Sequence, residues 1–210
     1  MEILLPILLI PGAVLIGAMS PGPSFVLIAS ISVKNSRRDG LSASLGMGVG
    51  GVIYATLSLL GLHALLTAVP TLYLLLKVIG GLYLIYLAIC IWRGANEPMV
   101  VESSNMSPWV SIRKSFLLGL FTQISNPKTA IVYASIFAAL LPAEIPDAVF
   151  YSLPVLIFLV EAGWYFIVAF IFSSKTPRGI YLKSKSVFDR IAATVMFGLG
   201  VRLLSSANSS

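Results

Sequence analysis

Apolar residues gather in six long stretches along this chain, separated by shorter segments that carry most of the charges. A helix of about 20 apolar residues crosses the roughly 30 Å hydrocarbon core of a membrane. The stretches are continuously apolar rather than alternating, which is typical of helices. The sequence therefore predicts an all-α integral membrane protein with six transmembrane helices. We place these helices near residues 3–33, 41–62, 68–92, 113–141, 148–172 and 187–205.

The first and fourth stretches are too long for one simple crossing, and each contains a proline motif. The motifs are Ser20-Pro21-Gly22-Pro23-Ser24 and Ser125-Asn126-Pro127-Lys128-Thr129. Proline lacks a backbone N–H and clashes with the preceding helical turn, so it ends or kinks a helix. Ser20-Pro21 and Asn126-Pro127 each place a capping side chain before a proline, which favours the start of a new helix. We expect transmembrane helices 1 and 4 to be broken at these motifs.

The two proline motifs also align as an internal repeat. In this alignment Ser20 matches Ser125, Ala29 matches Ala134, and Ser30 matches Ser135. Each half would hold three spans, an odd number, so the halves would enter the membrane in opposite senses. Such inverted repeats are common in secondary transporters, whose broken helices meet near the bilayer midplane. We expect repeats at residues 1–93 and 113–210, joined by a cytoplasmic linker at residues 94–112.

A helix that begins inside the membrane presents free backbone N–H groups and the positive end of its dipole. Two such ends that meet from opposite sides form a site for an anionic group such as a carboxylate. The alternative is a pair of proline kinks that only shape helix packing. The predicted substrate-binding residues are Ser20, Pro21, Gly22, Pro23, Ser24, Asn126, Pro127, Lys128 and Thr129.

Two charged residues fall deep inside predicted spans. Lys128 lies about halfway along the fourth, and Glu161 lies near the middle of the fifth. A lysine at the bilayer centre costs about 3 kcal/mol on insertion scales, so it needs a partner or water. We expect Lys128 and Glu161 to share a polar cavity and to pair, with Glu161 as the proton-coupling residue. The alternative is a structural ion pair that fixes the register of two helices.

The composition excludes most soluble classes. The chain is 58% hydrophobic and 10% charged, whereas a soluble domain is about 25% charged. The net charge of +6 does not indicate nucleic-acid binding, because the basic residues cluster in short loops between spans. That positive-inside pattern predicts that loops 33–40, 93–114 and 173–190 are cytoplasmic. No hydrolase motif or P-loop is present, so we expect neither an enzyme nor a cofactor.

Several motifs in order resemble the LysE/RhtB family of amino-acid exporters. They are Pro21-Gly22-Pro23, Arg37-Arg38-Asp39-Gly40-Leu41, the run from Leu76 to Leu87, Asn126-Pro127-Lys128, and the run from Gly198 to Leu203. The resemblance implies efflux of amino acids or small derivatives across the bacterial inner membrane by proton antiport, often by a homodimer. Two departures stand out. Ser24 stands where many members have Asp or Asn, and the second span lacks a polar or acidic residue near Gly51.

We therefore expect a secondary transporter that exports amino acids or small derivatives by proton antiport. One alternative is a heavy-metal cation exporter of the same superfamily. Such a protein would have few side chains to coordinate a metal, because the chain has one cysteine, one histidine and one acidic residue deep inside a predicted span. Another alternative is a membrane assembly subunit that transports nothing. Its broken-helix residues would tolerate substitutions that keep the packing volume.

Overall fold

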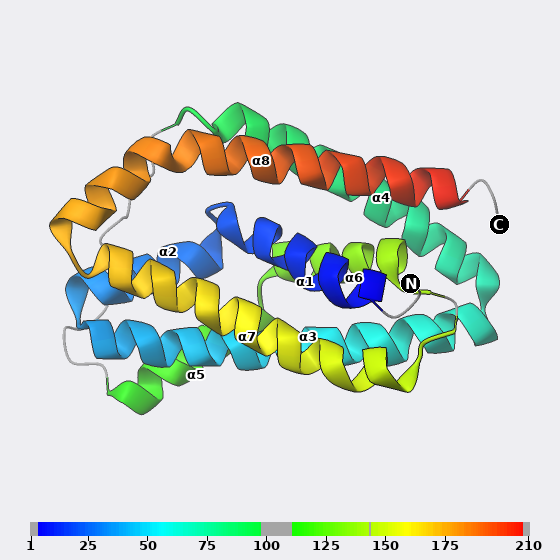
Figure 1. Cartoon of the computed structure of the whole chain (residues 1–210), viewed down its shortest axis with the longest axis horizontal. Helices are drawn as coiled ribbons and strands as arrows, with labels where there is room; N and C mark the ends of the chain where they lie inside the picture. The colour runs from blue at the N-terminus through cyan, green and yellow to red at the C-terminus, as the bar shows by residue number, and fades with distance from the viewer. Residues whose placement is uncertain (1–3, 98–110, 143, 208–210) are drawn as a thin grey trace.

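A computed structural model describes residues 4–97, 111–142 and 144–207. These residues form eight α-helices and no strand, which confirms the predicted all-α class (Figure 1). The helices are α1 (Leu4–Met19), α2 (Pro23–Lys34), α3 (Arg37–Ala68), α4 (Pro70–Gly94), α5 (Ile112–Ile124), α6 (Pro127–Leu140), α7 (Asp147–Phe172) and α8 (Lys175–Ala207). Of the predicted 94–112 linker, residues 98–110 lie outside the described part of the chain.

Three described helices are long and apolar enough to cross a membrane alone, over Arg37–Leu62, Thr71–Gly94 and Asp147–Phe172. Helices α1 and α2 pass the same test together and meet at a bend of 61°. Helix α6 is a shorter apolar helix. The chain is thus a multi-pass membrane protein with three to four clear apolar spans among the described residues.

Each proline motif separates two helices, α1 from α2 and α5 from α6, and the first of these pairs forms a bent apolar span as predicted. At the second motif Asn126 is the N-cap, and its side-chain Oδ1 accepts a hydrogen bond of 3.0 Å from the backbone N–H of Lys128. At the first motif the predicted cap at Ser20-Pro21 is wrong, because α2 begins two residues later at Pro23 with Gly22 as N-cap. Proline disfavours the helical conformation of the residue before it. Gly22 is accordingly extended and cannot belong to a helix that starts at Pro21.

The helices form three groups in Figure 1. Helices α4 and α8 lie side by side on one face, α3, α5 and α7 lie on the other, and α1, α2 and α6 lie between them. Gly46 and Gly50 of α3, four residues apart on one helix face, allow α5 to approach closely. A Cβ at Gly46 would overlap the carbonyl of Phe116, and one at Gly50 would lie 2.7 Å from the Gln123 side chain.

Helix α8 begins much earlier than residue 187, where the sixth span was expected to start. Most of the predicted 173–190 loop is therefore helical, and that loop assignment is wrong. Tyr181, Lys185 and Asp189 recur every fourth residue and are all buried. A polar segment with one buried face packs as a helix even though its mean hydropathy is low.

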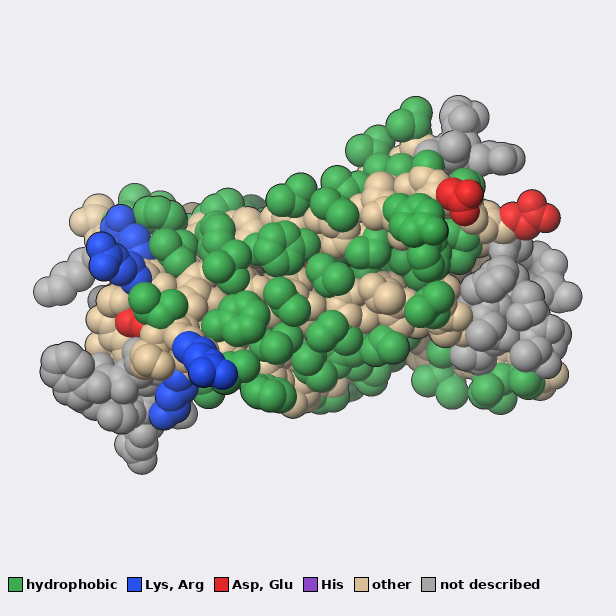
Figure 2. Space-filling view, turned by 90° about the horizontal axis from the view of Figure 1, so that it is seen from below, with side chains coloured by type: hydrophobic (Ala, Val, Ile, Leu, Met, Phe, Trp, Pro, Cys, Tyr) green, Lys and Arg blue, Asp and Glu red, His purple; other side chains and the backbone are tan. Residues whose placement is uncertain are grey.

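The outer surface agrees with a membrane location. Large hydrophobic side chains such as Leu57, Ile79 and Val155 are each more than half exposed. Figure 2 shows hydrophobic side chains over the middle of one face, with Lys and Arg gathered at one end beside a small acidic patch, and larger acidic patches at the other end. We call the end at which α3 begins, at Arg37, the basic end, and the end at which α7 begins, at Asp147, the acidic end. An exposed apolar band between charged ends fits a molecule whose middle contacts lipid.

Candidate functional site

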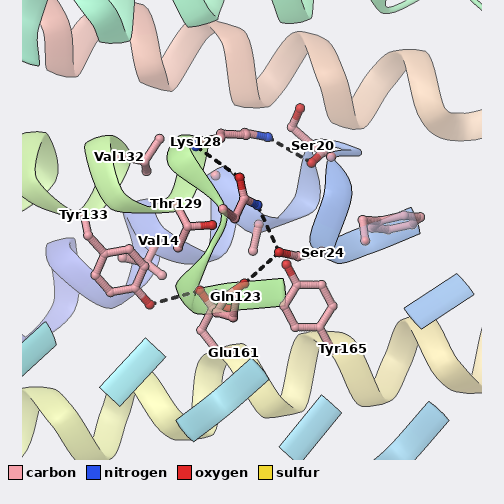
Figure 3. Close-up of a pocket in the computed structure, with 15 residues that line it drawn as sticks. Val14, Ser20, Ser24, Gln123, Lys128, Thr129, Val132, Tyr133, Glu161 and Tyr165 are labelled. Atoms are coloured by element: carbon pink, nitrogen blue, oxygen red, sulfur yellow. Dashed lines mark hydrogen bonds between the residues drawn. The ribbon is translucent and has the colours of Figure 1, made fainter. Parts of the chain in front are cut away.

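The two helix breaks and the middle of α7 enclose a small cavity of about 30 Å³ (Figure 3). That volume is about the share of one water molecule in liquid water. Its polar lining consists of Ser20, Ser24, Gln123, Asn126, Lys128, Thr129, Tyr133, Glu161 and Tyr165. Segments far apart in sequence therefore meet at one point. We call this space the central cavity.

The predicted substrate-binding residues divide between two cavities. Ser20, Gly22, Ser24, Asn126, Lys128 and Thr129 line the central cavity. Pro21 and Pro23 line a larger neighbouring cavity instead. Pro127 is exposed and lines neither of these two cavities. The prolines thus shape the breaks, and polar neighbours supply the groups that face the central cavity.

Lys128 connects the two breaks. Its ammonium Nζ donates a hydrogen bond of 3.2 Å to the backbone carbonyl of Ser20, at the end of α1. A Cβ at Gly22 would lie 3.4 Å from the same nitrogen, so the glycine leaves room for the ammonium beside the extended backbone. A half-buried cation between two helix ends is well placed to attract an anion.

A chain of hydrogen bonds joins the same breaks a second time. The Asn126 amide donates to the Ser24 hydroxyl at 3.0 Å, and that hydroxyl donates to the Gln123 side-chain oxygen at 2.8 Å. All three side chains are buried. Buried polar groups without partners are costly, so this chain holds the start of α2 against α5 and α6.

Glu161 forms the floor of the central cavity. Its Oε1 accepts a hydrogen bond of 3.0 Å from the Tyr133 hydroxyl, and its Oε2 has no hydrogen-bond partner among the described residues. A Cβ at Gly51 would lie 2.9 Å from the Tyr133 oxygen and 3.0 Å from Glu161 Cγ. The glycine at position 51 therefore leaves space for this pair.

Lys128 and Glu161 line the same cavity, as predicted, but the expected ion pair between them is wrong. Within the described part of the chain, the ion pair found joins Lys185 to Asp189. The Lys128 ammonium binds the Ser20 carbonyl instead, and Glu161 binds Tyr133. The break between α1 and α2 leaves the Ser20 carbonyl without the partner that a continuous helix would supply, and this carbonyl accepts the hydrogen bond from the ammonium.

Three polar residues of the cavity were missed by the sequence reasoning. They are Gln123, Tyr133 and Tyr165. Helical spacing indicates that two of them face the site, because Tyr133 follows Thr129 by four positions and Tyr165 follows Glu161 by four. Residues four apart share a helix face. Gln123 carried a weaker signal as an amide within an apolar stretch.

A larger cavity of about 430 Å³ adjoins the central cavity toward the basic end. Ser20, Gly22 and Lys128 line both cavities, so the ammonium stands at their junction. The outer lining comes from the end of α4 and the beginning of α8. Its volume lies within the range of about 300–1,000 Å³ that is usual for small-molecule sites. We call it the vestibule.

Toward the acidic end the central cavity is closed by packed apolar side chains. Ile10 of α1 and Ile136 of α6 are fully buried in one hydrophobic cluster. Beyond them along the same helices lies a third cavity, with Leu5, Leu140 and Glu144 in its lining. The polar site is therefore separated from the acidic end by an apolar barrier.

A buried polar site where helices begin and end inside a multi-pass membrane protein is typical of membrane transport proteins. Residues 15–207 match the family described as LysE type translocator, and the chain belongs to this family. No solved structure matches the chain at a significant level.

The curated relatives support this assignment. The threonine efflux protein of Salmonella typhi is 31% identical over 195 residues, which cover 91% of this chain and 94% of that protein. The threonine efflux protein of Escherichia coli K12 is 30% identical with the same coverage. The uncharacterized membrane protein YahN of Escherichia coli K12 is 28% identical, over 92% of this chain and 86% of that protein.

Proposed function

We propose that this protein exports amino acids from the cytoplasm across the bacterial inner membrane. The observation that carries the proposal is the position of Lys128. Its ammonium lies between two helix breaks and lines both the central cavity and the vestibule. A substrate carboxylate would replace the Ser20 carbonyl as its partner. Membership of a translocator family and relatives named threonine efflux protein support this direction, so threonine is the first substrate to test.

The two helix starts supply the rest of the carboxylate site. Ser24 and Thr129 lie in the first turns of α2 and α6 and line the central cavity. The first backbone N–H groups of a helix have no partner within it, and its dipole favours negative charge there. The Lys128 ammonium, the positive dipole ends of α2 and α6, and the hydroxyls of Ser24 and Thr129 would therefore all favour binding of the substrate carboxylate.

Export would be coupled to protons through Glu161. The side chain is 2% exposed, and one of its oxygens has no hydrogen-bond partner in the described structure. A proton on that oxygen would remove the charge of a buried carboxyl group, and its release would restore the charge beside the substrate site. Proton entry from outside and substrate exit would alternate at one cavity.

The arrangement fits an inverted repeat with six spans, in which α1–α2 corresponds to α5–α6. The basic end would face the cytoplasm, because lysine and arginine favour that side. The vestibule would then open inward, and the barrier at Ile10 and Ile136 would close the outward path. Transport requires this barrier to open while the vestibule closes. The homodimer implied by the family resemblance stays a prediction.

Amino-acid analysis of dipeptide-fed cells tests the proposal. Cells with and without the protein receive a threonine-containing dipeptide, and threonine is followed inside the cells and in the medium. The proposal predicts faster release and a lower intracellular level when the protein is present. Parallel feeding with other dipeptides identifies the cargo if threonine is not exported. The proposal fails if no amino acid leaves faster than from control cells.

A further inference from the structure

A second charged site lies across the vestibule from the helix breaks. Lys185 and Asp189, both on α8, form an ion pair of 2.8 Å between Nζ and Oδ2. The Lys185 ammonium also donates a hydrogen bond of 2.8 Å to the Gly94 carbonyl, at the end of α4. Both side chains line the vestibule. Lys185 thus fixes α8 against α4 and holds one oxygen of the Asp189 carboxylate.

The other oxygen of Asp189 has no role in this fixation. Asp189 is 3% exposed, and its Oδ1 has no hydrogen-bond partner among the described residues. A buried carboxylate oxygen without a donor is costly, and such an atom in a native protein calls for an explanation. A purely structural pair would explain Oδ2 and leave Oδ1 unexplained. An additional donor, best a cationic one, would satisfy it.

The vestibule also presents a charge of the opposite sign. Lys128 lines it from the helix breaks, and Asp189 lines it from α8. A free α-amino acid carries a carboxylate and an ammonium on the same carbon. The vestibule lining contains Lys128, Lys185, Glu97 and Asp189, and Lys185 is already bound to Asp189 and to the Gly94 carbonyl. Lys128 and the second oxygen of Asp189 together match both groups, whereas a simple carboxylic acid or amine would satisfy one of them only.

We propose that Asp189 binds the α-ammonium group of the substrate in the vestibule while Lys128 attracts its carboxylate. The site would therefore select zwitterionic α-amino acids. Lys185 is a positioning residue that holds Oδ2 and leaves Oδ1 for the substrate. This inference rests on the proposed export function and adds the residue that recognises the ammonium group of the substrate.

Ligand-induced thermal shifts of the purified protein in detergent test the inference. The probe is threonine, or the amino acid that gives the largest shift, with its deaminated and decarboxylated analogues. For threonine these are 3-hydroxybutyrate and 1-amino-2-propanol. Asp189→Asn should weaken amino-acid binding about tenfold or more, since a charged contact is lost. Binding of the deaminated analogue should not change, so the preference for the amino acid collapses.

Two further variants separate selectivity from folding. Asp147→Asn makes the same chemical change at the acidic end, and it should keep the wild-type preference. Asp189→Glu keeps a carboxylate at this position and should retain the preference for the ammonium group. If Asp189→Asn does not fold, equal binding of threonine and 3-hydroxybutyrate by the wild-type protein or by a folded Asp189→Glu protein would overturn the assignment.

Failure of this inference differs from failure of the export function. A wild-type protein that binds no amino acid and exports none overturns both. A wild-type protein that binds and exports an amino acid, with an unchanged preference in Asp189→Asn, overturns the role of Asp189 alone.

Discussion

The Lys128 ammonium on α6 donates a hydrogen bond of 3.2 Å to the backbone carbonyl of Ser20, beyond the end of α1, and both residues line the central cavity. Two breaks from different halves of the chain are thereby joined by a cation and a carbonyl. A neutral carbonyl is a weaker partner for an ammonium than a carboxylate is. The contact can therefore hold the site together without substrate and give way when substrate arrives.

Ser24→Ala should destabilise the protein, because it removes one hydrogen-bond partner from each of Asn126 and Gln123. Leaving buried amide groups without partners costs about 1–3 kcal/mol. Thermal unfolding in detergent measures the effect. Ser125→Ala serves as control, since that side chain is exposed beside the second break. Equal unfolding temperatures for the two variants would show that the chain of hydrogen bonds contributes no stability.

Glu161→Gln should separate substrate exchange from proton coupling. The amide keeps the shape of the side chain and an acceptor for Tyr133, but it cannot carry a proton at neutral pH. In proteoliposomes, exchange of labelled for unlabelled threonine should continue, and accumulation driven by a pH gradient should be lost. Glu144→Gln, an exposed acid at the acidic end, should retain both activities. Gradient-driven accumulation by Glu161→Gln at the wild-type level would exclude Glu161 as the proton carrier.

Gly46→Ala should weaken the packing of α3 on α5, because a Cβ there overlaps the Phe116 carbonyl. Forcing an extra methyl group into a tight contact costs about 1–3 kcal/mol. Gly61→Ala is the matched control on the same helix, since a Cβ there meets nothing within 4 Å. That control should be neutral or stabilising by up to about 1 kcal/mol. A Gly46→Ala protein as stable as Gly61→Ala would contradict the close approach of these helices.

The orientation can be tested with single cysteines in a Cys90→Ala background. Asn96→Cys lies at the basic end beside α4, and Glu144→Cys lies at the acidic end; both positions are exposed. A membrane-impermeant maleimide added to intact spheroplasts should label residue 144 at once and residue 96 only after permeabilisation. The reverse pattern would place the vestibule on the outside and would contradict export from an inward-open state.

The positions of the helix breaks at the site could be predicted, because they depend on residues that are neighbours in the sequence. Proline acts within one helical turn, so the breaks near Pro23 and Pro127 follow from the sequence. The cap at Asn126 follows for the same reason, and the error at Ser20 came from a second proline that shifts the helix start to Pro23. These features depend on neighbours in the chain.

The polar contacts could not be predicted in the same way, because they join elements distant in sequence. Nothing local indicates that the Lys128 ammonium binds the Ser20 carbonyl rather than Glu161. The pair of Lys185 and Asp189 was assigned to a loop, since a polar segment gives no membrane-span signal before its buried partners are known. The packing of the helices against one another determines which partners Lys128 and Lys185 contact.

Exchange of labelled threonine by Lys128→Met in proteoliposomes tests the central claim most directly, with exposed Lys114→Met as control. If the ammonium holds the substrate carboxylate, Lys128→Met should insert and fold but exchange threonine at least about tenfold more slowly, while Lys114→Met retains the wild-type rate. Wild-type exchange by a folded Lys128→Met protein would contradict the claim that the two helix breaks bind the substrate through this cation.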